Sequence, residues 1–270
     1  MATRHEILRE LGLLPVWHLR GPASGAAEPR SDGATIPPTR ASPAIGTGNP
    51  EALHNAADPP SDRLQHIATL DWPEFAADVA ACTACALCKT RNKAVPGVGD
   101  RRAQWLFVGE APGAEEDAKG EPFVGQAGKL LDNMLAALGM KRGQNVYIAN
   151  VLKCRPPGNR TPSPLEAEAC RPYLDRQIAL IRPVLIVALG KSAATTLLNV
   201  DASIASLRGR VHRYQGVPLI VTYHPAYLLR SLLDKAKAWE DLCLARATMR
   251  RLLAGSDQGA GLQTLGADPS

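Results

Sequence analysis

Residues 183–198 read PVLIVALGKSAATTLL, and this stretch decides the fold. Its first part, PVLIVAL (183–189), is an unbroken apolar run of strand length, and GKSAATTLL (190–198) follows it directly as a predicted helix. A buried strand that runs into a helix is the unit from which parallel sheets with helices on both faces are built. The stretch therefore predicts an α/β fold.

The same alternation of strands and helices continues on both sides of this unit. The other predicted strands are QWLFVG (104–109), NVYIANVLK (145–153) and VPLIVTY (217–223). The predicted helices cover 64–82, 126–139, 163–181 and 234–254. Ligands of such sheets bind at the carboxyl ends of the strands. Three of these ends lead into loops of unusual composition, which makes the loops candidates for a functional site.

The chain divides by composition into four parts. Residues 1–20 contain a short helical pattern, and residues 21–62 are rich in Gly, Pro, Ala and Ser, which predicts a disordered linker. A globular domain is expected over 63–254, with a flexible tail over 255–270. The N-terminal helix either binds a partner, for which a replication or repair protein is the candidate, or packs back on the domain.

The charge and the hydropathy pattern limit the class of partner. The net charge is +5 and the pI is about 9.0, which fits a partner rich in phosphate, such as nucleic acid. No apolar stretch reaches the length of a membrane span, and the first residues lack the apolar core of a secretory signal. We therefore expect a cytoplasmic protein that does not bind membranes.

Six cysteines suggest a metal or cluster site. Cys82 and Cys85 form a C-x-x-C pair, and Cys154 and Cys170 lie far downstream. Four thiolates can bind a zinc ion or an iron–sulfur cluster, and the spacing alone does not choose between the two. Cys88 could compete as a ligand, and Cys243 is expected to be a buried thiol.

Four motifs, in this order along the chain, resemble those of family 4 uracil-DNA glycosylases, the iron–sulfur type. They are GEAPG (109–113), EPFVGQAG (121–128), KCRPPGNR (153–160) and HPAYLLR (224–230). The resemblance covers about residues 78–253. It implies a three-layer α/β/α fold around a four-stranded parallel sheet. It also implies a [4Fe–4S] cluster held by Cys82, Cys85, Cys154 and Cys170, and a monomer.

By the same resemblance, the enzyme is a monofunctional hydrolase that acts on uracil-containing DNA and leaves an abasic site in base excision repair. The uracil swings out of the duplex into a pocket. Phe123 would stack on the base. Asn150 would recognise its Watson–Crick edge, because a side-chain amide has one donor and one acceptor to match uracil N3–H and O4. Cytosine presents the opposite pattern.

The resemblance also assigns catalytic groups. His224 would donate a hydrogen bond to uracil O2, where negative charge develops as the base departs. Glu110 is the first candidate to orient or deprotonate the attacking water, and Glu116 on the same loop is the second. The backbone amide of Ala111 would add a donor.

DNA binding falls to the last two motifs. Either Leu228 or Leu229 would insert into the base stack as an apolar wedge. The guanidinium groups of Arg230, Arg155 and Arg160 would contact phosphates.

Two differences from related families favour ordinary hydrolytic turnover, and three other functions are alternatives. Family 5 relatives carry an apolar residue where Glu110 stands, and a covalently trapped relative has an inserted His-containing loop, whereas TPSPLEAEAC (161–170) has no His. A zinc-stabilised nucleic-acid-binding module would leave Glu110, Asn150 and His224 without a role. An electron carrier would be expected to have more closely spaced cysteines. A glycosylase with a wider range of deaminated bases is the third alternative.

Overall fold

The computed structural model describes the backbone of residues 60–260 and the side chains of residues 62–254. The predicted N-terminal helix and nearly all of the predicted linker lie outside the described residues, as do residues 261–270. No helix in the described part of the chain is long and apolar enough to cross a membrane.

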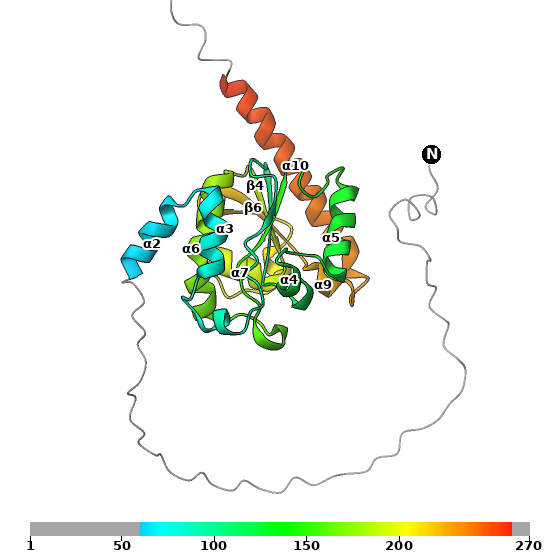
Figure 1. The fold of residues 1–270 in the computed structure, drawn as a ribbon. Helices are drawn as coiled ribbons and strands as arrows, with labels where there is room; N and C mark the ends of the chain where they lie inside the picture. The colour runs from blue at the N-terminus through cyan, green and yellow to red at the C-terminus, as the bar shows by residue number, and fades with distance from the viewer. Residues whose placement is uncertain (1–59, 261–270) are drawn as a thin grey trace, which may run out of the picture. The chain divides into compact units, whose positions relative to one another are not determined.

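A single mixed sheet forms the centre of the fold (Figure 1). Its spatial order is β1-β3-β2-β4-β6-β5. The inner strands β3, β2, β4 and β6 are parallel to one another, and the edge strands β1 and β5 pair antiparallel. The strands are β1 (Val98–Gly99), β2 (Trp105–Gly109), β3 (Val146–Asn150), β4 (Leu185–Leu189), β5 (Val211–Tyr214) and β6 (Val217–Thr222).

The predicted α/β class and the four parallel strands are confirmed, but the sheet has six strands rather than four. The two extra strands give a weak sequence signal. β1 is two residues long, and β5 has only one buried side chain. Gln215 and Gly216 connect β5 to β6 with positive φ angles of 48° and 83°, which are typical of a two-residue hairpin turn.

Helices cover both faces of the sheet. Their bounds are α2 (Pro60–Thr69), α3 (Trp72–Ala81), α4 (Ala114–Lys119), α5 (Gln126–Ala137), α6 (Pro164–Ile181), α7 (Lys191–Leu198), α8 (Ile204–Leu207), α9 (Pro225–Leu228) and α10 (Asp234–Ala260), with 3₁₀ turns η1 (Ala86–Lys89) and η2 (Pro157–Asn159). In Figure 1, α3 and α6 lie on one side of the sheet, and α5 and α10 lie on the other.

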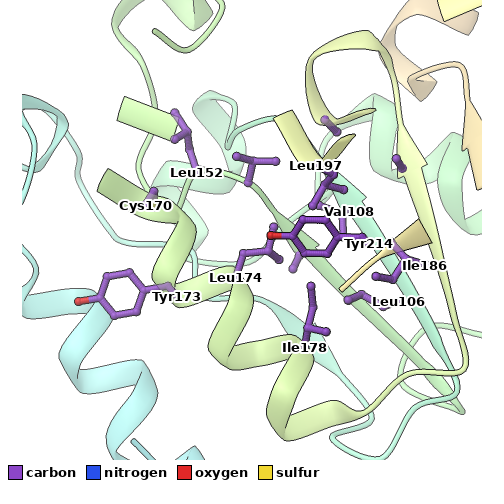
Figure 2. Packing of buried hydrophobic residues seen from close by; sticks show 14 of the residues in the cluster. Leu106, Val108, Leu152, Cys170, Tyr173, Leu174, Ile178, Ile186, Leu197 and Tyr214 are labelled. Atoms are coloured by element: carbon purple, nitrogen blue, oxygen red, sulfur yellow. The ribbon is translucent and has the colours of Figure 1, made fainter. Parts of the chain in front are cut away.

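Alternate side chains of β2 divide the core between these two faces. Leu106 and Val108 pack with α3, α6 and α7 in a cluster that Figure 2 shows around Leu174 and Ile178. Trp105 and Phe107 belong to the cluster on the opposite face, with apolar residues of α5 and α10. Both faces of the inner strands are therefore buried, as their continuous apolar sequences require.

Two helix boundaries differ from those expected. The predicted helix over 64–82 is two helices, because the chain breaks at Leu70 and Asp71 and restarts with Pro73 in the first turn of α3. The closing helix, expected to end at 254, continues to Ala260.

Candidate active site

A cavity of about 530 Å³ opens at the carboxyl ends of the parallel strands. It lies where β2, β3 and β6 give way to loops, the position at which α/β sheets bind their ligands. Most of the predicted site residues line it together: Glu110, Ala111, Glu116, Phe123, Asn150, Arg160, His224 and Arg230.

Phe123 occupies a backbone conformation that the surrounding glycines permit. Its φ is 55°, in the left-handed region, and its ring is stacked on that of His224 with centroids 5.5 Å apart. A Cβ on Gly109 would lie 2.6 Å from the Phe123 ring, and a Cβ on Gly128 would lie 1.8 Å from its carbonyl oxygen. Both positions therefore require glycine if the ring is to remain in the cavity wall.

Arg142, which the sequence did not single out, fixes the segment before α5. Its guanidinium donates to the carbonyl oxygens of Pro122 and Phe123, at 2.8 and 2.7 Å. The third contact is with the Asp132 carboxylate at 3.0 Å. This clamp holds the strained turn from the side away from the cavity.

Asn150 ends β3 with a buried side chain that lacks a partner for its acceptor. The residue is 2% exposed, and no hydrogen bond reaches its Oδ1 from the described residues. A buried carbonyl oxygen without a donor is costly, so such an atom in a cavity wall indicates a ligand that supplies the donor. A Cβ on Gly109 would lie 2.4 Å from this oxygen, which again explains the glycine.

His224 is held as a neutral imidazole. It is the N-cap of α9, and its Nδ1 accepts a hydrogen bond from the Ala226 backbone N–H at 3.1 Å. Burial, with the positive charge of Arg230, lowers the pKa of His224 to about 4. Because Nδ1 acts as the acceptor, the single proton of the ring lies on Nε2, which leaves Nε2–H as a donor.

The two carboxylates predicted to act in catalysis have different surroundings. Burial raises the pKa of Glu110, and a hydrogen bond with Ser192 partly offsets this effect. Glu116 instead accepts hydrogen bonds from the backbone N–H groups of Gly113, Val124 and Gly125, at 3.1, 2.9 and 3.1 Å. Its carboxylate joins the two motif loops, which favours a positioning role for Glu116, and its catalytic role stays a prediction.

The two leucines of HPAYLLR are not equivalent. Leu228 is 1% exposed and packs with Tyr223 and Ala238, whereas Leu229 is 43% exposed. Leu229 is therefore the more accessible of the two wedge candidates, and the choice between them stays a prediction. Leu232 and Leu233, which were not predicted, extend the exposed apolar surface after Leu229.

The three predicted phosphate-binding arginines also differ. Arg230 lines the cavity. Arg160 also lines the cavity but forms a bidentate ion pair with Glu166, with N–O distances of 2.8 and 2.6 Å. This pair lowers the pKa of Glu166 to about 2. Arg155 lies outside the cavity lining and donates to Asn159 Oδ1 at 2.7 Å. Both Arg155 and Arg160 therefore help to shape the loop after β3.

A second cavity, of about 900 Å³, adjoins the first and shares Glu110 and His224 with it. Its wall includes Gly190, Lys191 and Ser192 at the N-terminus of α7. The positive end of a helix with free backbone N–H groups favours a phosphate oxygen. The sequence contained this signal, since GKS directly follows a predicted strand, but we did not predict a site there.

The cysteines gather around a third, small cavity. Cys82, Cys85, Cys88, Cys154 and Cys170 all line it, with Cys154 and Cys170 buried. Among the described residues, no three His, Cys, Asp or Glu side chains converge closely enough for one metal ion. Thiolates that line one cavity are potential ligands of a zinc ion or an iron–sulfur cluster.

Cationic and N–H groups face these sulfurs. Arg91 Nη1 donates to Cys154 Sγ at 3.0 Å, and the Lys153 backbone N–H donates to Cys170 Sγ at 3.2 Å. Burial raises the pKa of Cys154 and raises that of Cys170 to about 12, and these donors offset the effect of burial only in part. Cys243 lies on α10 and does not line this cavity, and it is half-buried rather than buried as predicted.

Comparisons with known proteins place this geometry in a family. The model of the uracil DNA glycosylase superfamily matches residues 96–243. The chain is 49% identical over 160 residues to the type-4 uracil-DNA glycosylase of Archaeoglobus fulgidus, covering 56% of this chain and 80% of the relative. For the enzymes of the same name from Pyrobaculum aerophilum and Sulfurisphaera tokodaii, the identities are 46% over 171 residues and 48% over 161. These cover 60% and 56% of this chain, and 87% and 73% of the relatives.

Proposed function

The chain belongs to the uracil-DNA glycosylase superfamily, among the type-4 enzymes, and we propose that its 530 Å³ cavity receives a uracil flipped out of DNA. The protein is accordingly a DNA-repair hydrolase. In the proposed reaction the N-glycosidic bond is cleaved by water, free uracil leaves, and an abasic site remains in the strand. Among the described residues no lysine lines this cavity, so we propose hydrolysis without strand cleavage.

The unpartnered Oδ1 of Asn150 is the observation that carries this proposal. Uracil N3–H would supply the missing donor, and the Asn150 amide N–H would donate to uracil O4. Cytosine offers an acceptor at N3 and a donor at N4, so it would leave both groups of the amide unpaired. In a buried site that mismatch gives strong discrimination.

The departing base gains negative charge, and His224 is poised to stabilise it. Its neutral ring offers Nε2–H as a donor, which we assign to uracil O2. Because the ring is neutral, it stabilises charge by hydrogen bonding and does not need to transfer its proton. Phe123 supplies the aromatic wall of the pocket beside it.

Glu110 is the group we assign to the water. It is half-buried, lines both adjoining cavities, and belongs to the loop that follows β2. Its carboxylate can orient or deprotonate a water that attacks the sugar, and its negative charge favours the oxocarbenium-like transition state. The backbone N–H of Ala111 is an additional donor in the same wall.

We assign DNA binding to one exposed leucine and to polar groups that line the two cavities. Leu229 is the exposed apolar side chain that would fill the space left by the flipped base. Arg230 lines the first cavity, and Lys191 and Ser192 at the start of α7 line the second. We propose that these three polar side chains contact phosphates on either side of the uracil.

The cysteine cavity fits a [4Fe–4S] cluster, for which we propose Cys82, Cys85, Cys154 and Cys170 as ligands. When bound, the cluster would tie together the segment before β2, the loop after β3 and helix α6. Hydrolysis of a glycosidic bond involves no net oxidation or reduction, so the proposed role of the cluster is structural. Cys88 lies in the same wall and is a fifth thiol for four irons.

Single-turnover cleavage of an oligonucleotide with one uracil tests the proposed function, with iron content measured on the same anaerobically purified sample. Wild-type protein should release uracil and carry about four irons per chain. Asn150→Ala should lower the rate constant by at least about a hundredfold. Asn133→Ala, on the exposed face of α5, is the matched control and should not change it. A folded, iron-loaded wild-type protein that leaves the oligonucleotide intact would refute the proposal.

A further inference from the structure

Lys153 is a buried lysine whose ammonium group lies behind the proposed uracil pocket. The residue is 1% exposed. Its Nζ donates to the backbone carbonyl oxygen of Asn150 at 2.8 Å and to Gln177 Oε1 at 2.5 Å. In residues 62–254 no carboxylate forms an ion pair with it. A buried charge of this kind requires compensation from another source.

A cluster bound in the cysteine cavity would supply that compensation. Lys153 lines this cavity, and its backbone N–H donates to Cys170 Sγ at 3.2 Å. Its neighbour in the chain, Cys154, lines the same wall. Four thiolates around an iron–sulfur core carry net negative charge, so the ammonium of Lys153 and the cluster would stabilise each other.

The hydrogen bonds of Lys153 connect that charge to Asn150. Gln177 lies fully buried on α6, the helix that also carries Cys170. Its Nε2 donates to the carbonyl oxygen of Pro96 at 2.7 Å and to the Tyr147 hydroxyl at 3.2 Å. Gln177 is thereby fixed, and it fixes Lys153 in turn. Lys153 donates to the Asn150 backbone carbonyl oxygen and so fixes the end of β3.

The Asn150 side chain depends on this support, because no described protein group donates a hydrogen bond to its Oδ1. With no protein donor to its Oδ1, the direction of its amide follows from the position of its backbone. The Lys153 ammonium is the side-chain group that hydrogen-bonds that backbone at its carbonyl oxygen. A shift of this carbonyl would move the amide relative to the base.

We propose that Lys153 is a positioning residue that couples the cysteine cluster to the amide of Asn150, so that the cluster helps to set uracil recognition. The inference rests on the proposed function of the cavity and on the ligation of a cluster by the cysteines. It assigns Lys153 no contact with the base. Its effect passes through the Asn150 carbonyl on one side and through its charge near the sulfurs on the other.

Two readouts test the proposal on the full-length, iron-loaded protein: inhibition by free uracil and the midpoint potential of the cluster. Lys153→Met keeps the length of the side chain and removes its charge and donors. We expect free uracil to inhibit this variant about tenfold more weakly, as for one lost hydrogen-bond position. We also expect a more negative midpoint potential, because a positive charge near the cluster has gone.

Lys141→Met is the matched control. Lys141 is exposed and precedes β3, at the end of the strand opposite Asn150, so both readouts should equal those of wild type. Gln177→Glu is a second variant for the case in which Lys153→Met does not fold. Its carboxylate would pair with Lys153, draw the ammonium from the Asn150 carbonyl and add negative charge, so both readouts should shift in the same directions.

Wild-type uracil inhibition and a wild-type potential in a folded Lys153→Met or Gln177→Glu protein would overturn the proposal. This outcome differs from a failure of the proposed function, which would appear as wild-type protein that releases no uracil. A changed potential with unchanged uracil inhibition would also overturn the coupling, since the charge would then act on the cluster alone.

Discussion

At the scale of single residues, the protonation state of His224 governs what the site can do. A pKa near 4 leaves the ring neutral over the whole physiological range, although an unperturbed histidine would be half-protonated at pH 6.5. The single-turnover rate should therefore show no step near pH 6.5 from this group. His224→Ala should lower the rate about 10²–10³-fold at all pH values between 5 and 8. A wild-type profile with a titration near 6.5 that this variant abolishes would contradict the neutral-donor assignment.

The same residue makes stability depend on pH. Because the folded pKa of about 4 lies below the ordinary value of 6.5, the unfolded chain binds more protons between these two pH values. The free energy of unfolding should therefore rise between pH 4 and pH 6.5. This gain should be lost as the pH is lowered from 6.5 to 4. Urea unfolding of wild type and His224→Gln across this window measures the effect, and the variant should show the weaker dependence.

The adjacent leucines Leu228 and Leu229 give a matched pair of substitutions. Leu228→Ala should lower the free energy of unfolding by about 2–5 kcal/mol, because the side chain is buried among Tyr223 and Ala238. Leu229→Ala should leave it within about 0.5 kcal/mol of wild type and slow cleavage of duplex DNA. Denaturant melts and cleavage of matched single- and double-stranded substrates separate the two effects. Equal stability losses would place both leucines in the core.

At the scale of elements, the loops after the strands are held by backbone contacts that sequence motifs do not reveal. Glu116→Ala removes the acceptor of three N–H groups, so we expect a stability loss of about 1–3 kcal/mol and a raised KM.

Glu110→Gln should instead lower kcat about 10²–10⁴-fold with little change in stability. If Glu116→Gln lost as much kcat as Glu110→Gln while melting like wild type, the positioning role of Glu116 would be wrong.

The elements themselves were largely predictable. The four inner strands are apolar runs because both of their faces are buried, and this pattern is local in the sequence. Ser163 and Pro164 marked the start of α6, where the Ser163 hydroxyl accepts the Glu166 backbone N–H. The family was also predicted from its four motifs, and the comparisons confirm it.

What the sequence did not predict depends on contacts between distant segments. Lys153 would be expected at the surface, and only Gln177 on α6 and the Asn150 carbonyl explain its burial. Leu228 and Leu229 are chemically identical, and only the packing of α9 distinguishes them. Glu110 and Glu116 differ in their surroundings, since Glu116 accepts hydrogen bonds from three backbone N–H groups and Glu110 has a hydrogen bond with Ser192, and no local pattern encodes that difference.

At the scale of the whole molecule, the positive charge should appear as salt dependence. The chain carries a net charge of +5, and each phosphate contact releases a counterion when DNA binds. Arg230→Ala should reduce the slope of log Kd against log salt by about 1. Arg250→Ala, an exposed arginine late in α10 and outside both cavity linings, should leave the slope unchanged. Equal slopes for wild type and Arg230→Ala would remove Arg230 from the phosphate contacts.

The placement of the cysteines also has a consequence for biosynthesis. Cys82, Cys85 and Cys88 precede β2, Cys154 follows β3, and Cys170 lies further on, in α6. A cluster bound to the proposed ligands Cys82, Cys85, Cys154 and Cys170 would close β2, α4, α5 and β3 into one covalently linked loop, which limits the conformations of the unfolded chain. The ribosome must release Cys170 before the last ligand exists. Complete ligation of a cluster is therefore possible only after Phe123, Asn150 and Cys170 have all been synthesised, whereas it does not require His224.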